Sequence, residues 1–124
     1  MSEFVQYLAE VFERFGPIET RRMFGGHGVY HNGTMFGLVA GDVLYLKAGP
    51  ETSGYFKERG LRPFEYLRGG RPVNLSYYQA PEEIFDDPDV ARTWAQRAYA
   101  SAMGAKNLKQ GDQQTKRRAL RKGR

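Results

Sequence analysis

The chain has 124 residues, which is enough for one domain with its own hydrophobic core. It contains no cysteine, so a disulfide framework and thiolate chemistry are excluded, and this usage is typical of a reducing cytosol. The N-terminal segment is polar and lacks the apolar region of a signal peptide, and no stretch is apolar enough to span a bilayer. We therefore expect a cytoplasmic protein without a membrane association.

The formal net charge of +5 is concentrated at the C-terminal end of the chain. Residues 105–124 contain eight Lys or Arg and one acid, whereas residues 1–104 contain 11 bases and 13 acids. The C-terminal segment also lacks aromatic residues, so it cannot bury enough surface to offset the entropy of ordering. We predict a folded domain over residues 1–104 and a basic, disordered tail over residues 105–124.

The first predicted elements are a helix and a strand. Apolar side chains recur at helical spacing over residues 2–15, with Ser2 as N-cap and Gly16-Pro17 as the stop. A strand over Ile18–Phe24 then leads into the next segment.

The segment Met23–Ala48 is predicted to form a three-stranded antiparallel meander, on which the rest of the chain is built. Asn32-Gly33 fits a type I′ hairpin turn, and Gly41-Asp42 fits a type II′ turn. Two-residue loops at these positions predict the cross-strand pairs Tyr30–Met35, Gly28–Gly37, Gly37–Leu46 and Leu38–Tyr45. The first two pairs belong to one hairpin and the last two to the next. Since glycine within a strand often marks close approach of another backbone, the Gly28–Gly37 pair predicts a notch for a docked helix.

Alternation of side chains gives this meander two different faces. One face carries no charge, and we expect helices to cover it; its residues are Tyr30, Met35, Val39, Leu44 and Leu46. The opposite face mixes large apolar groups with titratable ones, including His27, His31, Thr34 and Lys47. We predict that a partner binds this second face through Val29, Phe36, Leu38 and Tyr45.

For the second half of the chain we predict two helices and a hairpin. A short helix over Glu51–Arg59 ends at Gly60. A hairpin then joins Phe64–Arg68 and Arg71–Tyr78 through Gly69-Gly70, pairing Phe64 with Leu75 and Tyr66 with Val73, and Pro72 suggests an edge strand.

After one helical turn at Pro81–Phe85, Asp87-Pro88 provides an N-cap and a proline at the first helical position. The helix is predicted to end near Met103, with Gly104 as the stop. Its buried side is expected to contain Val90, Ala91, Trp94, Ala98 and Ala102.

Catalytic patterns are sparse. His27 and His31 are four residues apart on a strand, about 13 Å, which is too far to hold one metal ion. No nucleophile elbow, phosphate-binding loop or dinucleotide motif occurs, so we expect neither an enzyme nor a cofactor. The alternative is a small-molecule or anion-binding domain, or an enzyme, that uses the Gly25–Gly28 region with Arg22 and His27. In that case Arg22, Gly25 and Gly26 would bind the anion.

The basic tail is the strongest indication of a partner. Its cations are Lys116, Arg117, Arg118, Arg121, Lys122 and Arg124. They predict weak, salt-dependent and sequence-independent binding of nucleic acid. The alternative is a solubilising tail that binds nothing specific.

The motif Arg22-Met23-Phe24-Gly25-Gly26-x-Gly28-x-Tyr30, with Met35-Phe36-Gly37-Leu38-Val39 and Leu44-Tyr45-Leu46-Lys47, resembles the N-terminal domain of the TfoX/Sxy family. Tyr77-Tyr78, Pro81-Glu82-Glu83, Asp87-Pro88 and Trp94 extend the resemblance over residues 1–103. The resemblance implies a two-layer α+β fold of secretion-chaperone-like type, with helices on one side of an antiparallel sheet. It supplies no catalytic residues.

The same resemblance implies a non-enzymatic regulator that acts with transcription factors in competence-type gene expression. Longer family members carry a second, helical domain where this sequence has the basic segment. Our hypothesis is an interaction domain that binds a protein partner, such as a transcription factor, or its own copy as a homodimer, with the tail adding affinity for DNA. A structural adaptor without a nucleic-acid role is the third alternative.

Overall fold

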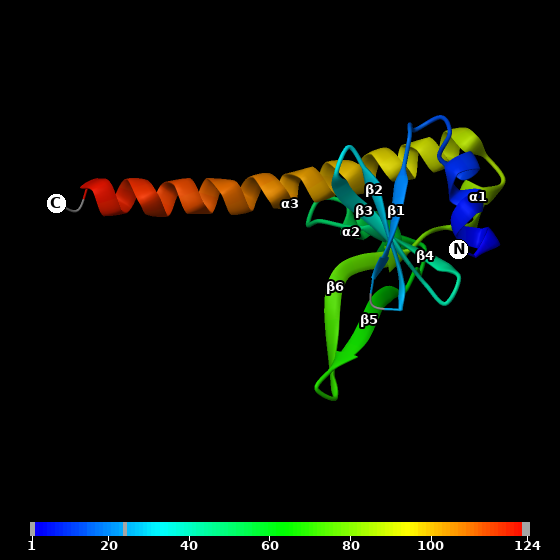
Figure 1. Ribbon diagram of the computed structural model, residues 1–124, viewed down its shortest axis with the longest axis horizontal. Coiled ribbons are helices and arrows are strands. Elements are labelled where there is room, and N and C mark those ends of the chain that lie inside the picture. The colour runs from blue at the N-terminus through cyan, green and yellow to red at the C-terminus, as the bar shows by residue number, and fades with distance from the viewer. Residues whose placement is uncertain (1, 24, 123–124) are drawn as a thin grey trace.

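Six strands and three helices form an α+β fold in the computed structural model, which describes residues 2–23 and 25–122 (Figure 1). The side chains of residues 73, 74 and 106–122 lie outside this description. In chain order the elements are α1 (Glu3–Val11), β1 (Glu19–Met23), β2 (Gly26–His31), β3 (Thr34–Ala40), β4 (Val43–Lys47), α2 (Ser53–Glu58), β5 (Pro63–Arg68), β6 (Arg71–Gln79), the 3-10 turn η1 (Glu82–Phe85) and α3 (Pro88–Lys122). Among the described residues, no helix is both long and apolar enough to cross a bilayer.

All strands form one antiparallel sheet in the order β1-β2-β3-β4-β6-β5. The predicted pairing of β3 with β4 is confirmed, including Gly37 opposite Leu46 and Leu38 opposite Tyr45. Asn32 and Gly33 both have positive φ, as a type I′ turn requires. Gly41 and Asp42 also both have positive φ, so this turn is of type I′, and the predicted type II′ is wrong.

The predicted register between β2 and β3 is wrong beyond the pair Tyr30–Met35. Next to that pair the register shifts by one residue, so that Val29 lies opposite Gly37 and Gly28 lies opposite Leu38. Phe36 is thus the extra residue of a β-bulge in β3. Gly28 and Gly37 are not cross-strand neighbours, and the predicted notch between them does not exist.

Because side chains alternate along a strand, the bulge exchanges the predicted faces of the residues that precede it in the chain, from β2 to Phe36. Val29, Phe36, His31 and Thr34, expected on the partner-binding face, lie on the face that the helices cover. There Phe36 contacts Phe12, and Thr34 contacts Met103. The His31 ring is tilted against Phe15 and meets Tyr99 edge to face. Tyr30 and Met35, expected under the helices, lie on the opposite face with Leu38 and Tyr45.

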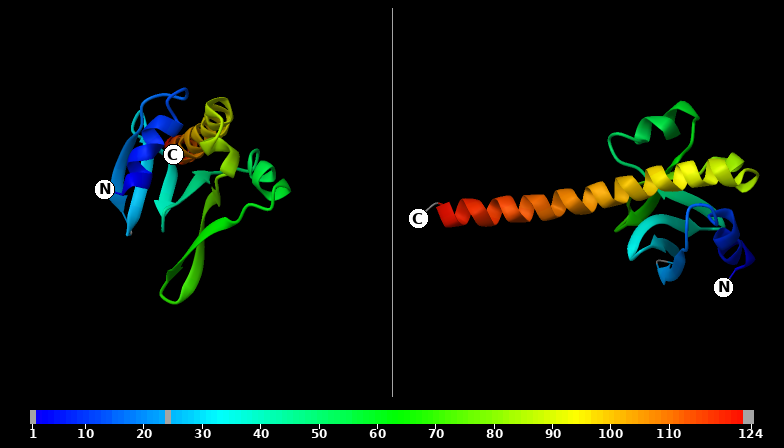
Figure 2. Two further views of the ribbon diagram at one scale, coloured as in Figure 1. Left: turned by 90° about the vertical axis from the view of Figure 1, so that its right-hand side faces the viewer. Right: turned by 90° about the horizontal axis from the view of Figure 1, so that it is seen from above.

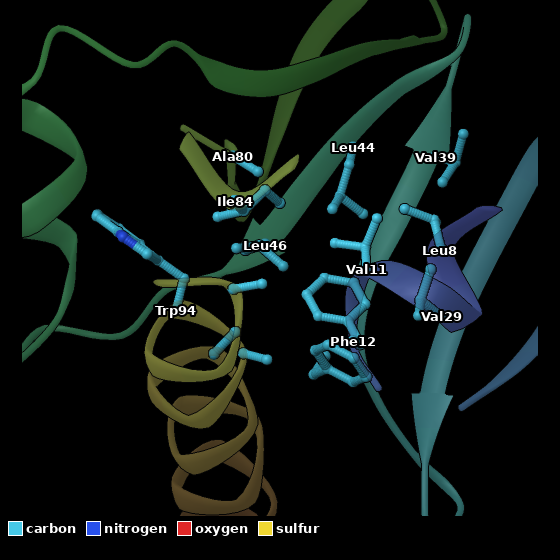
Figure 3. Close-up of a cluster of buried hydrophobic side chains, with 14 of the residues drawn as sticks. Leu8, Val11, Phe12, Val29, Val39, Leu44, Leu46, Ala80, Ile84 and Trp94 are labelled. Atoms are coloured by element: carbon cyan, nitrogen blue, oxygen red, sulfur yellow. The ribbon is translucent and has the colours of Figure 1, made fainter. Parts of the chain in front are cut away.

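The hydrophobic core lies between this covered face and the helices α1 and α3 (Figures 2 and 3). Ser2 Oγ accepts a hydrogen bond from the Val5 N–H, and it caps α1 as predicted. Core side chains come from α1 (Val5, Leu8, Val11), from the strands (Val29, Phe36, Val39, Leu44, Leu46) and from α3 (Ala91, Trp94, Ala95, Ala98, Ala102). The small alanines of α3 let this helix lie close to β3 and β4.

Helix α3 begins as predicted and continues farther than predicted. Asp87 Oδ1 accepts hydrogen bonds from the backbone N–H groups of Asp89 and Val90, as an N-cap does. The helix then extends past Gly104 to Lys122 and projects beyond the sheet, so the predicted helix end at Gly104 is wrong (Figure 1). The division of the chain into a domain and a basic tail remains a prediction.

The β5–β6 hairpin turns at Gly69 and Gly70, which both have positive φ. The predicted pair Tyr66–Val73 is confirmed, whereas a register shift between Pro63 and Glu65 replaces the predicted pair Phe64–Leu75. β6 is an inner strand, but β4 pairs only with Tyr77–Gln79. Pro72 therefore lies where β6 pairs with β5 alone, and the cost of its missing N–H is avoided.

Candidate functional site

The face of the sheet opposite α1 and α3, which we call the open face, contains a small apolar hollow. Its volume is about 100 Å³. The lining residues are Met23, Gly26, His27, Met35, Leu38, Val39, Ala40, Phe64, Tyr66 and Leu75. Because β1, β2, β3, β5 and β6 all contribute, the hollow exists only once the β5–β6 hairpin lies against the meander.

Aromatic contacts fix the base of the hairpin on the open face. The rings of Tyr45 and Phe64 meet edge to face with centroids 4.9 Å apart, and Phe64 stacks with Tyr66 at 6.3 Å. Leu38 is only 7% exposed although no helix covers it. The hairpin therefore shields part of the open face and leaves the hollow beside it accessible.

Gly28 makes room for flexible side chains on this face. A Cβ atom at Gly28 would lie 2.7 Å from the sulfur of Met23, 2.9 Å from the Tyr30 ring and 3.1 Å from the sulfur of Met35. The predicted role of Gly28 as a docking notch for a helix is therefore wrong. The two thioethers over this glycine are polarizable and flexible, and such groups adapt to varied apolar partners.

Two cation–aromatic contacts occur on the same face. The Arg21 guanidinium carbon lies 4.6 Å from the ring centroid of Tyr30, and Lys47 Nζ lies 5.2 Å from that of Tyr77. Burial raises the pKa of Tyr77 to about 12, with a smaller contribution from the charge of Tyr30. The Tyr77 phenol is consequently neutral at physiological pH, and its ring packs under the Lys47 side chain.

Of the four residues predicted to bind a partner, the structure places two in the core and two on the open face. Val29 and Phe36 are fully buried in the core at 0% exposure, so their assignment to a binding surface is wrong. Leu38 and Tyr45 do lie on the open face, where binding remains a prediction.

Met23, Met35, Phe64 and Tyr66 line the hollow but were not predicted as site residues. Alternation in the β5–β6 hairpin does place Phe64 and Tyr66 on one side. However, nothing in the sequence shows that this side turns toward β3.

The region predicted to bind an anion is not assembled around Arg22. Gly25 and Gly26 border a second hollow of about 270 Å³ with Ser2, His27, Val39, Gly41 and Asp42, and Arg22 does not line it. His27 Nε2 is buried and makes no hydrogen bond to any described residue. An anion site remains a prediction, and the carboxylate of Asp42 at this hollow does not favour it.

Residues 116–122 continue α3 along the backbone, and their side chains lie outside the described part of the structure. Nucleic-acid binding by the basic tail, Arg124 included, therefore remains a prediction. Within the described ranges, no group of three or more His, Asp or Glu side chains could hold a metal ion.

A six-stranded antiparallel sheet with helices on one face and a partly open opposite face defines a small α+β domain. The chain belongs to the TfoX N-terminal domain family, whose model matches residues 10–102. It is 24% identical over 120 residues to the DNA transformation protein TfoX1 of Aliivibrio fischeri, covering 97% of this chain and 57% of that protein. It is also 31% identical over 80 residues to the protein Sxy of Escherichia coli, covering 64% of this chain and 36% of that protein.

Proposed function

We propose that this chain is a non-enzymatic regulator of competence-type gene expression that binds a protein partner through its open face. Family membership and the name of the TfoX1 relative, which refers to DNA transformation, support the regulatory role. In this proposal the partner is a component of the transcription machinery, and the basic C-terminal segment adds salt-dependent affinity for DNA.

The observation that carries the proposal is the contrast between the two faces of one sheet. The covered face is sealed by α1 and α3, whereas the open face retains a hollow lined mainly by thioether, aliphatic and aromatic groups. Such groups bind apolar side chains and have little capacity to transfer protons. A protein that inserts one or two apolar side chains between Met35 and Phe64 fits this lining.

The proposal is tested in the host organism by deleting the gene and complementing it with variants. Met35→Glu places a charge in the hollow, and we expect loss of competence-gene expression and of partner capture by the full chain. Tyr7→Glu is the matched control, because Tyr7 is 41% exposed on α1, away from the open face.

Thermal unfolding of both variants verifies that the fold is intact. A deletion strain with normal expression of competence genes would refute the regulatory role. Full complementation by Met35→Glu would instead refute only the open face as the binding surface. If the wild-type chain captures only a second copy of itself, the partner of the open face is this second copy in a homodimer, and the proposed transcription partner is refuted.

A further inference from the structure

We propose that the free end of the β5–β6 hairpin is a DNA-binding ribbon that enters the major groove of duplex DNA. We call residues 65–74 the ribbon. They pair across β5 and β6 at four positions, from Glu65–Asn74 to Arg68–Arg71, and β4 does not reach them. Two views show the ribbon projecting from the body of the molecule (Figures 1 and 2).

The dimensions of the ribbon suit a DNA groove. Four paired positions at about 3.3 Å each give a free length of about 13 Å. The major groove is about 8.5 Å deep and about 12 Å wide, and it admits a two-stranded β-ribbon. The tip can therefore reach the base edges while the base of the hairpin stays anchored on Tyr45 through Phe64.

The charge of this region is opposite to that of the rest of the domain. The ribbon contains two arginines and one glutamate, whereas the remainder of residues 1–104 contains nine bases and twelve acids. Arg68 and Arg71 are exposed and lie directly opposite each other at the tip. Neither forms an ion pair with a described residue, although like charges in that arrangement destabilise a hairpin. An anionic partner would offset this repulsion.

Exposed apolar groups beside the arginines distinguish this tip from a merely solubilising turn. Leu67 is 72% exposed, the largest value among the exposed large apolar side chains of the described residues, and it pairs with the exposed Pro72. By alternation, Leu67 and Pro72 lie on one side of the ribbon and the two arginines on the other. In the major groove, arginine binds phosphates or guanine, and an apolar side chain contacts the thymine methyl group.

Tyr66 at the base of the ribbon lines the hollow of the proposed function, but the ribbon tip, residues 67–72, contributes no lining residue and lies outside the basic C-terminal segment. Tip variants in the chain of 124 residues leave both of these unchanged, so failure of this inference and failure of the proposed function are distinguishable. The decisive measurement is fluorescence anisotropy of a labelled mixed-sequence duplex between about 50 and 200 mM salt.

The first variant is Arg68→Gln/Arg71→Gln, and its matched control is Lys57→Gln/Arg92→Gln. The control removes two exposed positive charges on α2 and α3, outside the ribbon. We expect the tip variant to bind about tenfold more weakly or worse, and the slope of log affinity against log salt to decrease by about 2. We expect the control to change affinity by less than about threefold. Arg68→Lys/Arg71→Lys keeps the charge and should retain the wild-type slope.

The second variant, Leu67→Ser, tests the apolar contact. We expect a several-fold loss of affinity without a change in the salt slope, because no counterion is released by an apolar contact. A duplex with uracil in place of thymine lacks the methyl groups, and it should weaken wild-type binding but not Leu67→Ser binding. These positions are exposed, and unfolding temperatures verify the fold.

Equal losses in the tip variant and its control would overturn the inference, because the effect would then be one of net charge. Unchanged affinity of Arg68→Gln/Arg71→Gln would overturn it as well, with all binding assigned to the C-terminal segment. A wild-type chain that ignores the duplex but binds polyglutamate through the tip would make the partner an acidic protein.

Discussion

The covered face and the open face of this sheet are built from the same strands, often from adjacent residues, and they differ in nearly every physical property. On the covered face, Val29, Phe36, Val39, Leu44 and Leu46 are at most 3% exposed. On the open face, methionines and aromatic side chains are partly exposed around a hollow. The covered face provides most of the hydrophobic stabilisation, whereas the open face keeps flexible thioether and aromatic groups partly accessible, as the proposed binding function requires.

A single residue decides which side chains belong to each face. Because Phe36 is the extra residue of the bulge, both Phe36 and Val39 point into the core, which regular alternation would not allow. Met35 is thereby assigned to the open face, where it lies over Gly28. The bulge thus determines both the composition of the core and the composition of the open face.

The largest expected effect is a difference in the free energy of unfolding between substitutions on the covered face and on the open face. Phe36 is fully buried, with ring centroids 5.6 Å from Phe12 and 5.2 Å from Phe15. We expect Phe36→Ala to lower the free energy of unfolding by about 3–5 kcal/mol, because it removes buried surface and leaves a cavity. The matched change Phe64→Ala on the open face should cost only about 1–2 kcal/mol.

Urea unfolding of the two variants measures this difference. Equal losses would mean that the hairpin base contributes as much as the core, and the division into a stabilising and a binding face would be incorrect. A change in the urea m-value would indicate an altered denatured state, and the comparison would then need a second probe.

The second prediction concerns the ionisation of Tyr77, which is buried on the open face. Below about pH 10 the Tyr77 phenol is protonated in both the folded and the unfolded chain. Between pH 10 and the folded-state pKa of about 12, the unfolded chain releases this proton and the folded protein retains it. The free energy of unfolding therefore falls over this range, by about 2–3 kcal/mol in total.

Comparison with Tyr77→Phe isolates this contribution from the other tyrosines. Between pH 9 and pH 12, the free energy of unfolding should decrease by about 2–3 kcal/mol less in this variant than in the wild type. The absorbance titration of the folded variant should lack the last phenolate step. Identical pH profiles for the two proteins would show that Tyr77 is accessible to solvent, and hence that the open face is less shielded than its contacts indicate.

Local chemistry in the sequence was sufficient to predict most of the elements. Asn32-Gly33 and Gly69-Gly70 have the positive φ angles that their turns require, and Asp87-Pro88 starts α3. The resemblance to the TfoX/Sxy family added the α+β class and the one-sided placement of the helices, which the structure confirms.

The errors have two physical causes. A bulge adds one residue to a strand without a clear sequence signal, and here it moved Val29 and Phe36 from the predicted binding surface to the core. A glycine within a helix costs only about 1 kcal/mol, so Gly104 is a weak stop when helix-forming residues follow it. The hollow was missed because it depends on how the β5–β6 hairpin lies over β3, which is a tertiary contact.

The smallest expected effect concerns the helix that seals the covered face. Asp87 accepts hydrogen bonds from two backbone N–H groups at the start of α3, at 2.9 Å from Asp89 and 3.3 Å from Val90. We expect Asp87→Ala to lower the free energy of unfolding by about 1 kcal/mol, because these donors lose their partner. Asp86→Ala is the control, since it removes the same charge from an exposed neighbour that does not cap α3. Equal losses in chemical denaturation would assign the effect to charge near the helix N-terminus. A specific loss at Asp87 that leaves capture of the proposed protein partner unchanged would show that the covered face can be weakened separately from the open face.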